Sequence, residues 1–173
     1  MKIKKYIAAF LLFLGFGSVQ ARHKLEGKIA PEFSGQAVFP DGSIKEFDLK
    51  DYKNQKIVLY FYPMDSTPGC TKQAKIFKDN IKKLQDQGIK VIGISYDSID
   101  SHLKFQKKYA LPYPLVSDAA KKHAISKLYK VSGFFSSERK TFLVNEKGII
   151  FKVFDKVDIK HQIDDILESF ARI

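Results

Sequence analysis

The most informative part of this chain is Ile57-Val58-Leu59-Tyr60-Phe61-Tyr62-Pro63-Met64-Asp65-Ser66-Thr67-Pro68-Gly69-Cys70-Thr71. Its first six residues form an apolar run, which is typical of a β-strand covered on both faces. Pro63 ends this run, and Pro68 opens a helical pattern, so Cys70 falls in the first turn of a helix. A helix N-terminus favours negative charge, and the reactive form of cysteine is the thiolate. The stretch therefore predicts a buried strand, a turn and a helix that begins with a candidate nucleophile.

Strand and helix patterns alternate along the rest of the chain. Strands or hairpins are predicted at residues 35–47, 89–96, 115–116 and 141–154. Helices are predicted at residues 70–87, 98–109 and 121–130, and a last helix from about residue 160. This order predicts one α/β domain over residues 22–173, with a central mixed sheet flanked by helices. Residues 22–33 are expected to be a flexible lead-in to this domain.

The N-terminus has the three parts of a secretory signal peptide. A lysine-rich start precedes the apolar residues 6–17, and Val19-Gln20-Ala21 offers small residues at a cleavage site. The apolar stretch is shorter than the roughly 20 residues that span a membrane as a helix. We therefore expect residues 1–21 to be a signal peptide cleaved after Ala21. The mature protein would be exported to the periplasm or cell envelope, without stable membrane insertion, and an uncleaved anchor is the alternative.

Charge and composition argue against several classes of function. The net charge is +11, but 27 of the 30 basic residues are lysines dispersed among acidic residues, which is typical of a solvated surface rather than of a nucleic-acid interface. The four histidines have no metal-site spacing, and no second cysteine could assist them, so no metal is predicted. One cysteine cannot close an internal disulfide, which leaves a free reactive thiol or an intermolecular partner.

The helical pattern alone leaves the role of Cys70 open. An apolar face with spacings of four and three residues contains Cys70, Ala74, Phe77, Ile81 and Leu84. Cys70 therefore points toward the core, where free cysteines often serve only as fillers. The first-turn position, the Thr67 hydroxyl three residues earlier and the shielding Pro63 favour a nucleophile instead.

The sequence around Cys70 resembles the active-site motif of peroxiredoxins, most closely the bacterioferritin-comigratory (PrxQ-type) branch. The similarity continues through Ala30-Pro31-Glu32-Phe33, Gly93-Ile94-Ser95-Tyr96-Asp97, the segment 111–118 and Arg139-Lys140-Thr141-Phe142-Leu143-Val144. It covers residues 30–173 and implies a thioredoxin-like fold. It also implies an enzyme that reduces hydrogen peroxide or organic hydroperoxides without a cofactor.

The resemblance assigns a role to each of four residues. Cys70 would be the peroxidatic cysteine, which peroxide oxidises to a sulfenic acid. Thr67 would hydrogen-bond the peroxide, and Pro63 would screen the thiolate. Arg139 would stabilise the thiolate and polarise the O–O bond. An arginine at this position is unusual in a chain that otherwise uses lysine almost throughout, and lysine does not reproduce the planar guanidinium.

The chain also departs from the branch. Many members carry a resolving cysteine five residues after the peroxidatic one, where this chain has Lys75. The partners implied are therefore a peroxide and an external thiol reductant, either a thioredoxin-like protein or a low-molecular-weight thiol. Lys72 and Lys75 either help to hold the thiolate or belong to a solvated helix face. Residues 132–138 form a shorter segment than the branch leads us to expect, and a monomer or weak homodimer is expected.

Two other functional classes remain as alternatives. A non-catalytic thioredoxin-like interaction module of the cell envelope would keep the fold, and its thiol would stay unmodified in low-micromolar peroxide. An exported disulfide oxidoreductase is disfavoured because the chain has no C-x-x-C motif.

Overall fold

A computed structural model describes residues 22–120 and 122–173, so the predicted signal peptide and its cleavage site lie outside the described residues. The strands are β1 (Ser34–Val38), β2 (Ile44–Asp48), β3 (Lys56–Phe61), β4 (Ile89–Ser95), β5 (Leu115–Ser117), β6 (Lys140–Val144) and β7 (Ile150–Phe154). The helices are α1 (Pro68–Asp79), α2 (Ile81–Asp86), α3 (Ile99–Tyr109), α4 (Ala124–Leu128) and α5 (Gln162–Ala171), with a 3₁₀ turn at Leu49–Tyr52.

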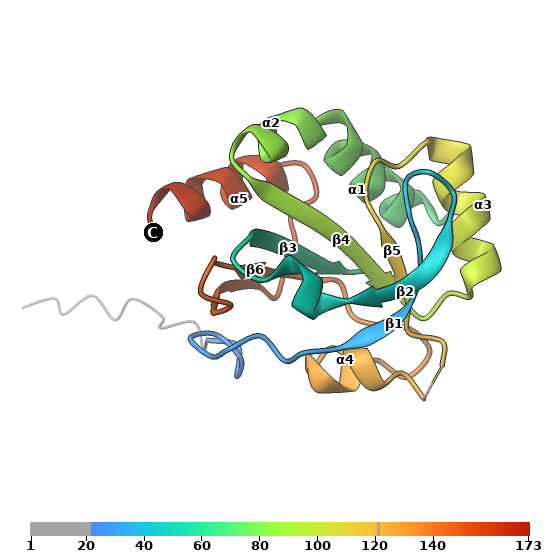
Figure 1. Cartoon of the computed structure of the whole chain (residues 1–173), viewed down its shortest axis with the longest axis horizontal. Coiled ribbons are helices and arrows are strands. Elements are labelled where there is room, and N and C mark those ends of the chain that lie inside the picture. Colours follow the sequence, from blue (N-terminus) through green and yellow to red (C-terminus); the bar gives the residue numbers. More distant parts are fainter. Residues whose placement is uncertain (1–21, 121) are drawn as a thin grey trace, which may run out of the picture.

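The strands form one mixed sheet in the order β2-β1-β5-β4-β3-β6-β7 (Figure 1). The three central strands β3, β4 and β5 are parallel, while β1 and β2 on one side and β6 and β7 on the other pair antiparallel. Parallel strands need helical crossovers, which α1 with α2 and then α3 supply. The predicted α/β architecture with a central mixed sheet is therefore confirmed.

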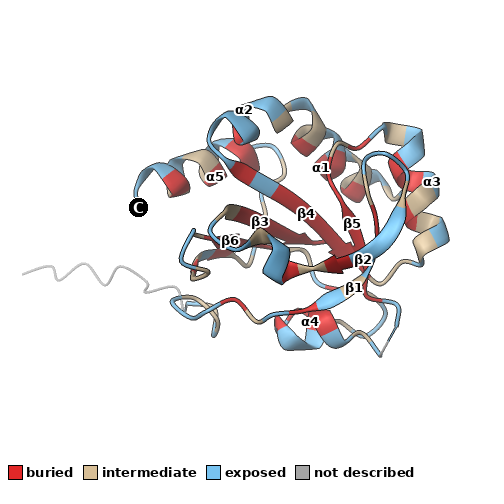
Figure 2. Cartoon of the chain, in the orientation of Figure 1, coloured by how far each residue is buried: buried red, intermediate tan, exposed pale blue. Residues whose placement is uncertain are grey.

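Side chains of β3 alternate between two hydrophobic cores on opposite faces of the sheet. Ile57, Leu59 and Phe61 belong to the core that also contains Ile125 of α4. Val58 and Tyr60 belong to the core formed with α1, α2, α3 and α5. Strand residues alternate faces, so a strand covered on both sides is apolar throughout, as the sequence predicted. Figure 2 shows the central strands buried and the outer helix faces exposed.

The helix predicted at residues 70–87 is in fact two helices that meet at Asn80. The Asn80 side-chain amide donates to the carbonyl of Ile76 at 2.9 Å, and its backbone, at φ −110° and ψ 9°, leaves the helical region. Asparagine side chains compete for backbone hydrogen bonds in this way, which is why they favour helix ends. The chain therefore turns between α1 and α2, and Ile81 becomes partly exposed.

The helix predicted at residues 121–130 begins later, at Ala124. Lys122 and His123 have φ values of 52° and 60°, in the left-handed region, so neither can belong to a right-handed helix. The carboxylate of Asp118 accepts hydrogen bonds from the first backbone N–H groups of α4, at Ile125 and Ser126. A carboxylate six residues before the helix thus caps the N-terminus of α4.

The expectation of a flexible lead-in at residues 22–33 is wrong. Ala30 and Phe33 are buried in the core on the α4 face, and the ring of His23 packs edge-on against Phe142 at 5.1 Å. The backbone N–H of Ala30 donates to Gly148 in the β6–β7 turn. The segment is held because its apolar side chains cover an otherwise open part of the sheet. Among residues 22–120 and 122–173, no helix has the length and apolar character that membrane crossing needs.

Candidate active site

Cys70 is the third residue of α1, at the carboxyl end of the central strand β3. Pro68 begins the helix and Thr67 precedes it with an extended backbone. The backbone N–H groups of a helix's first turn have no partner within the helix, and α1 has no acidic residue there to occupy them. The Cys70 side chain is 2% exposed and lies in the core shared with Ala74 and Phe77. The thiol is thus buried and also lies in the electropositive surroundings of a helix N-terminus.

Arg139 reaches this thiol from the start of β6, the strand next to β3 in the sheet. Its Nη2 lies 3.2 Å from Sγ of Cys70. The guanidinium also passes close to Gly69, where the Cβ of any larger residue would lie 3.4 Å from the same nitrogen. The position of Arg139 follows from strand pairing. Antiparallel β3 and β6 place Phe61 opposite Lys140, so Arg139 lies beside the end of β3. The Ser137 hydroxyl donates to the carbonyl of Tyr62 at 2.6 Å and fixes the approach to β6.

The positive charge of Arg139 is not shared with a carboxylate within the described part of the chain. Its Nη1 donates instead to the side-chain oxygen of Gln73, a neutral acceptor. The next residue, Lys140, contrasts with it, because its amine pairs with Asp155 at 2.7 Å and Glu138 at 3.1 Å. Burial lowers the pKa of Lys140, but these two partners outweigh the effect and raise it overall. The guanidinium therefore presents its charge to the sulfur.

Two glutamine side chains form a chain of hydrogen bonds that holds the Arg139 guanidinium in place. Gln73 accepts from Arg139 and donates from Nε2 to Oε1 of Gln162 at 3.0 Å. Both glutamines are buried, and Gln162 is the first residue of α5. Neither residue was predicted from the sequence. A signal existed for Gln73, because a polar residue three positions after Cys70 lies on the inward face of the helix.

The other two predicted site residues lie in the turn before α1. The Thr67 hydroxyl donates to the carbonyl of Met64 at 3.0 Å, so its proton is directed at the turn rather than at the thiol. Pro63 follows the end of β3 and is partly buried. The structure thus brings Cys70 and Arg139 into direct contact and places Thr67 and Pro63 in the adjoining turn.

The lysines near Cys70 do not contact it. Lys72 and Lys75 are exposed, and the Lys75 amine lies 5.8 Å from the centre of the Tyr109 ring. This arrangement favours the solvated helix face over a role in holding the thiolate. No group of three or more potential metal ligands occurs in the part of the chain that the structure covers.

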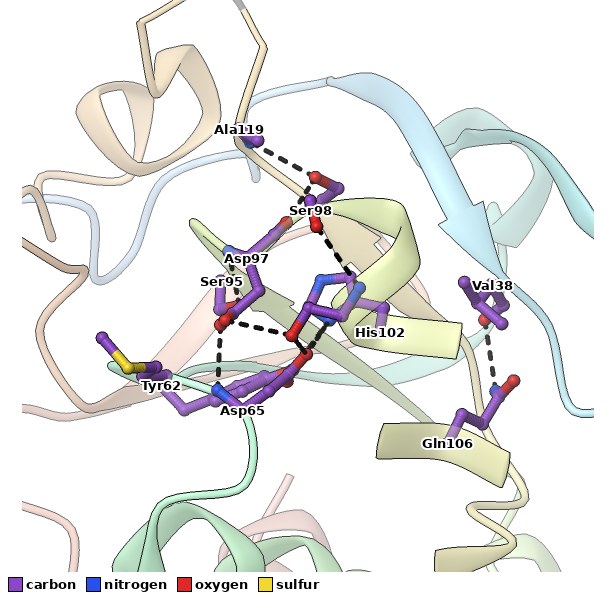
Figure 3. Close-up of polar contacts among 12 residues, drawn as sticks. Val38, Tyr62, Asp65, Ser95, Asp97, Ser98, His102, Gln106 and Ala119 are labelled. Carbon is purple, nitrogen blue, oxygen red and sulfur yellow. Dashed lines mark hydrogen bonds and ion pairs between the residues drawn. The ribbon is translucent and has the colours of Figure 1, made fainter. Parts of the chain in front are cut away.

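Asp65 and His102 form a polar network beside the turn, which Figure 3 shows. Asp65 Oδ2 lies 2.9 Å from Nδ1 of His102, and both side chains are buried. The Tyr62 hydroxyl donates to Oδ1 of Asp65 at 2.8 Å. Burial, followed by the charge of Asp65, raises the pKa of Tyr62 well above its ordinary value, so the phenol keeps its proton. Asp65 is a third residue near the site, after Gln73 and Gln162, that was not predicted from the sequence.

Comparisons with known proteins agree with this geometry. The model of the AhpC/TSA family matches residues 27–153. The peroxiredoxin Bcp of Bacillus subtilis is 39% identical over 127 residues, which are 70% of this chain and 81% of that protein. The structure of peroxiredoxin Q from Xanthomonas campestris superposes with a TM-score of 0.72 at 28% identity, covering 81% of this chain and 90% of the other.

These matches confirm the thioredoxin-like peroxiredoxin fold and do not favour a non-catalytic interaction module. The family acts on peroxides and uses thiol reductants, which is consistent with a buried thiol beside a guanidinium. The chain therefore belongs to the AhpC/TSA family and is a thiol-dependent peroxidase of the peroxiredoxin class, related to the Bcp and PrxQ proteins.

Proposed function

We propose that Cys70 is the peroxidatic cysteine and that it reduces both hydrogen peroxide and organic hydroperoxides. One observation carries this proposal, the 3.2 Å contact between Sγ of Cys70 and Nη2 of Arg139 in the first turn of α1. Guanidinium stays protonated at all physiological pH values, so it provides a permanent positive charge beside the sulfur. That charge favours the thiolate, which is the form that attacks peroxide.

The oxidation step follows from this arrangement. The thiolate forms a bond to one peroxide oxygen as the O–O bond breaks, and the other oxygen leaves as hydroxide or alkoxide and takes up a proton. Negative charge moves from sulfur to the leaving oxygen, and fixed donors such as Arg139 and the first-turn N–H groups stabilise it. Thr67 lies three residues away to orient the peroxide, and Pro63 limits access of water. The product is a sulfenic acid on Cys70.

Recovery of Cys70 depends on another molecule. The chain has no second cysteine, and Lys75 stands where a resolving cysteine would be. A first external thiol condenses with the sulfenic acid and releases water, forming a mixed disulfide. A second thiol then displaces Cys70 and leaves with the first as a disulfide. A thioredoxin-like protein or a low-molecular-weight thiol supplies both sulfurs.

We also propose that the enzyme is exported and acts as a monomer or weak homodimer. Export rests on the signal-peptide pattern of residues 1–21. Intact mass of the protein recovered from the cell envelope tests cleavage after Ala21, and retention of residues 1–21 would indicate an anchor instead. Sedimentation velocity across a range of protein concentrations tests the oligomeric state.

Peroxide consumption by the purified protein with dithiothreitol tests the role of Cys70. Cys70→Ser, which differs by one atom, should lose all thiol-dependent consumption. Intact mass after one equivalent of peroxide should show one added oxygen in the wild type and none in the variant. Lys82→Ala, on the solvent side of α2, should retain the wild-type rate. Equal consumption by the wild type and Cys70→Ser would overturn the proposal.

A further inference from the structure

The segment Pro63–Thr67, which joins β3 to α1, has little of its own to hold its shape. Met64 and Ser66 are exposed, and Pro63 and Thr67 are only partly buried. Ser66 has a φ of 59°, a left-handed conformation that residues other than glycine rarely adopt without outside support. Asp65 is the one buried residue of these five. The contacts of Asp65 therefore hold the segment in place.

Asp65 is fixed from four directions, as Figure 3 shows in part. Its Oδ1 accepts from the Tyr62 hydroxyl at 2.8 Å, and its Oδ2 accepts from the Ser101 hydroxyl at 2.8 Å. The same Oδ2 lies 2.9 Å from Nδ1 of His102. Its backbone N–H donates to the carboxylate of Asp97 at 2.9 Å. These partners come from the end of β3, from the β4–α3 loop and from α3.

The partners of Asp65 are themselves held by the central strands. His102 Nε2 lies 3.3 Å from the carbonyl oxygen of Val116 in β5. The carboxylate of Asp97 accepts from the Ser95 hydroxyl at 2.6 Å, and its carbonyl accepts from the Ser117 hydroxyl at 2.6 Å. The network thus ties the segment to the carboxyl ends of all three parallel strands.

The contact between Asp65 and His102 lies in the protein interior. Both side chains are almost completely inaccessible, at 2% and 0% exposure. One proton must lie between Oδ2 and Nδ1, because the oxygen lone pair would otherwise face the nitrogen lone pair. Removing either partner deprives a buried polar group of one hydrogen bond, which is unfavourable. The pair therefore favours the conformation in which the segment is closed.

The two halves of the reaction make opposite demands on this segment. A peroxide is small enough to reach a thiolate that is 2% exposed, whereas an external thiol must bring its own sulfur into line with Cys70. With no second cysteine in the chain, the outside thiol has to meet the sulfenic acid directly. The first turn of α1, which the segment precedes, has to move for that contact to form.

We propose that Asp65 and His102 are positioning residues that hold the segment Pro63–Thr67 and the first turn of α1 in the peroxide-reactive conformation, which the enzyme leaves when an external thiol reduces it. The inference rests on the proposed role of Cys70. A shift of the population toward the open conformation slows the oxidation step and speeds the reduction step. A general loss of stability does not predict this opposite effect.

The experiment measures the two steps separately in the full-length protein. Peroxide oxidation is followed by quenched-flow mass spectrometry of the sulfenic acid. Reduction is followed with thionitrobenzoate, a coloured aromatic thiol that joins Cys70 as a mixed disulfide and releases water. Asp65→Asn and His102→Asn should each slow oxidation about tenfold and accelerate capture by thionitrobenzoate several-fold. The double variant should be little worse than either single variant.

Gln106→Met is the matched control. Gln106 lies one turn further along α3 and is buried. It donates to the carbonyl of Val38 (Figure 3) and to that of Tyr113, and it has no hydrogen bond with Asp65. It should lower the melting temperature and leave the ratio of the two rate constants unchanged. With an active wild type, two results would overturn the inference. One is that oxidation and thionitrobenzoate capture change in the same direction in His102→Asn, and the other is that Gln106→Met also slows oxidation and accelerates capture. A wild-type protein that forms no sulfenic acid would overturn both the inference and the proposed function.

Discussion

Nη2 of Arg139 lies 3.2 Å from Sγ of Cys70, although 69 positions separate the two residues in the chain. The antiparallel pairing of β3 with β6 produces this contact, because it brings the residue before β6 beside the segment that follows β3. The guanidinium is anchored on its other nitrogen by the neutral Gln73. A cation that is held in place without being neutralised can act fully on the thiolate.

Arg139 substitutions should separate charge from geometry. Arg139→Met should slow oxidation by peroxide about a hundredfold or more, because one fixed donor to the developing charge is lost. Arg139→Lys should recover only part of the rate, since a single amine cannot contact both Gln73 and Sγ. Second-order rate constants with hydrogen peroxide are the measurement. Arg172→Lys, at an exposed arginine paired with Glu168, should behave as wild type, and a normal rate in Arg139→Met would contradict this account.

The buried amide of Gln162 should matter to the rate more than to stability. Gln162→Met removes the acceptor of Gln73 Nε2, and a neutral hydrogen bond contributes about 1 kcal/mol, so oxidation should slow about fivefold. Gln162 Nε2 has no partner among residues 22–120 and 122–173, so its removal also relieves a buried unsatisfied donor. The melting temperature should therefore stay close to that of the wild type. A large loss of stability at an unchanged rate would show that this chain of hydrogen bonds does not position Arg139.

The Thr67 hydroxyl should act on the reaction and not on helix capping. Thr67 precedes α1 but makes no side-chain cap hydrogen bond. Thr67→Val, which keeps the shape and removes the hydroxyl, should slow oxidation about a hundredfold, within the range for loss of a hydrogen bond to the reacting groups. Thr67→Ser should retain most of the rate. Equal rates in the two variants would mean that the hydroxyl only bonds to Met64.

A cysteine at position 75 should allow an internal disulfide with Cys70, and forming this disulfide should unwind part of α1. In a regular helix the Cα atoms of residues 70 and 75 lie about 8.6 Å apart, beyond the roughly 4.4–6.8 Å that a disulfide spans. Lys75→Cys should therefore lose two hydrogens on treatment with peroxide, and its far-ultraviolet circular dichroism should lose helical signal until a reductant is added. Lys82→Cys, twelve positions from Cys70, should form only intermolecular disulfides. An internal 70–75 disulfide with unchanged helical signal would contradict the prediction.

His23 and His161 should give opposite pH dependences of stability. Burial lowers the pKa of His23 below its ordinary 6.5, despite the opposing charge of Asp155. The unfolded chain then binds the proton more readily, so the contribution of His23 is complete above pH 6.5 and is lost as the pH falls through the folded-state pKa. When the pH is lowered from about 7.5 to about 5, the melting temperature of His23→Gln should therefore fall less than that of the wild type.

The hydrogen bond with Asp158 raises the pKa of the exposed His161, so the sign reverses. Its contribution is complete below pH 6.5 and is lost as the pH rises through the folded-state pKa. His161→Gln should therefore lose more melting temperature than the wild type on acidification. Differential scanning fluorimetry of the three proteins checks both signs, and parallel curves would contradict them.

Much of the fold could be predicted from local patterns. The apolar run of β3, the alternation of strands and helices and the last helix all follow from periodicities set by backbone geometry. The two wrong helix boundaries occurred where one polar side chain overrode the pattern. Asn80 divides the predicted helix by bonding to Ile76, and the carboxylate of Asp118 moves the start of α4 to Ala124. Neither hydrogen bond is visible in hydrophobic spacing.

Local sequence was enough to predict that a helix with Cys70 in its first turn follows a buried strand. It also showed that Lys75 stands in place of an internal resolving cysteine and that Arg139 is unusual among lysines. These are properties of neighbouring residues and of composition. The contacts between distant residues became known only from the folded chain: Arg139 with Cys70, Gln73 with Gln162, and Asp65 with His102. Such contacts depend on strand register and on side-chain conformations selected by packing, and these arise only when the whole sheet has formed.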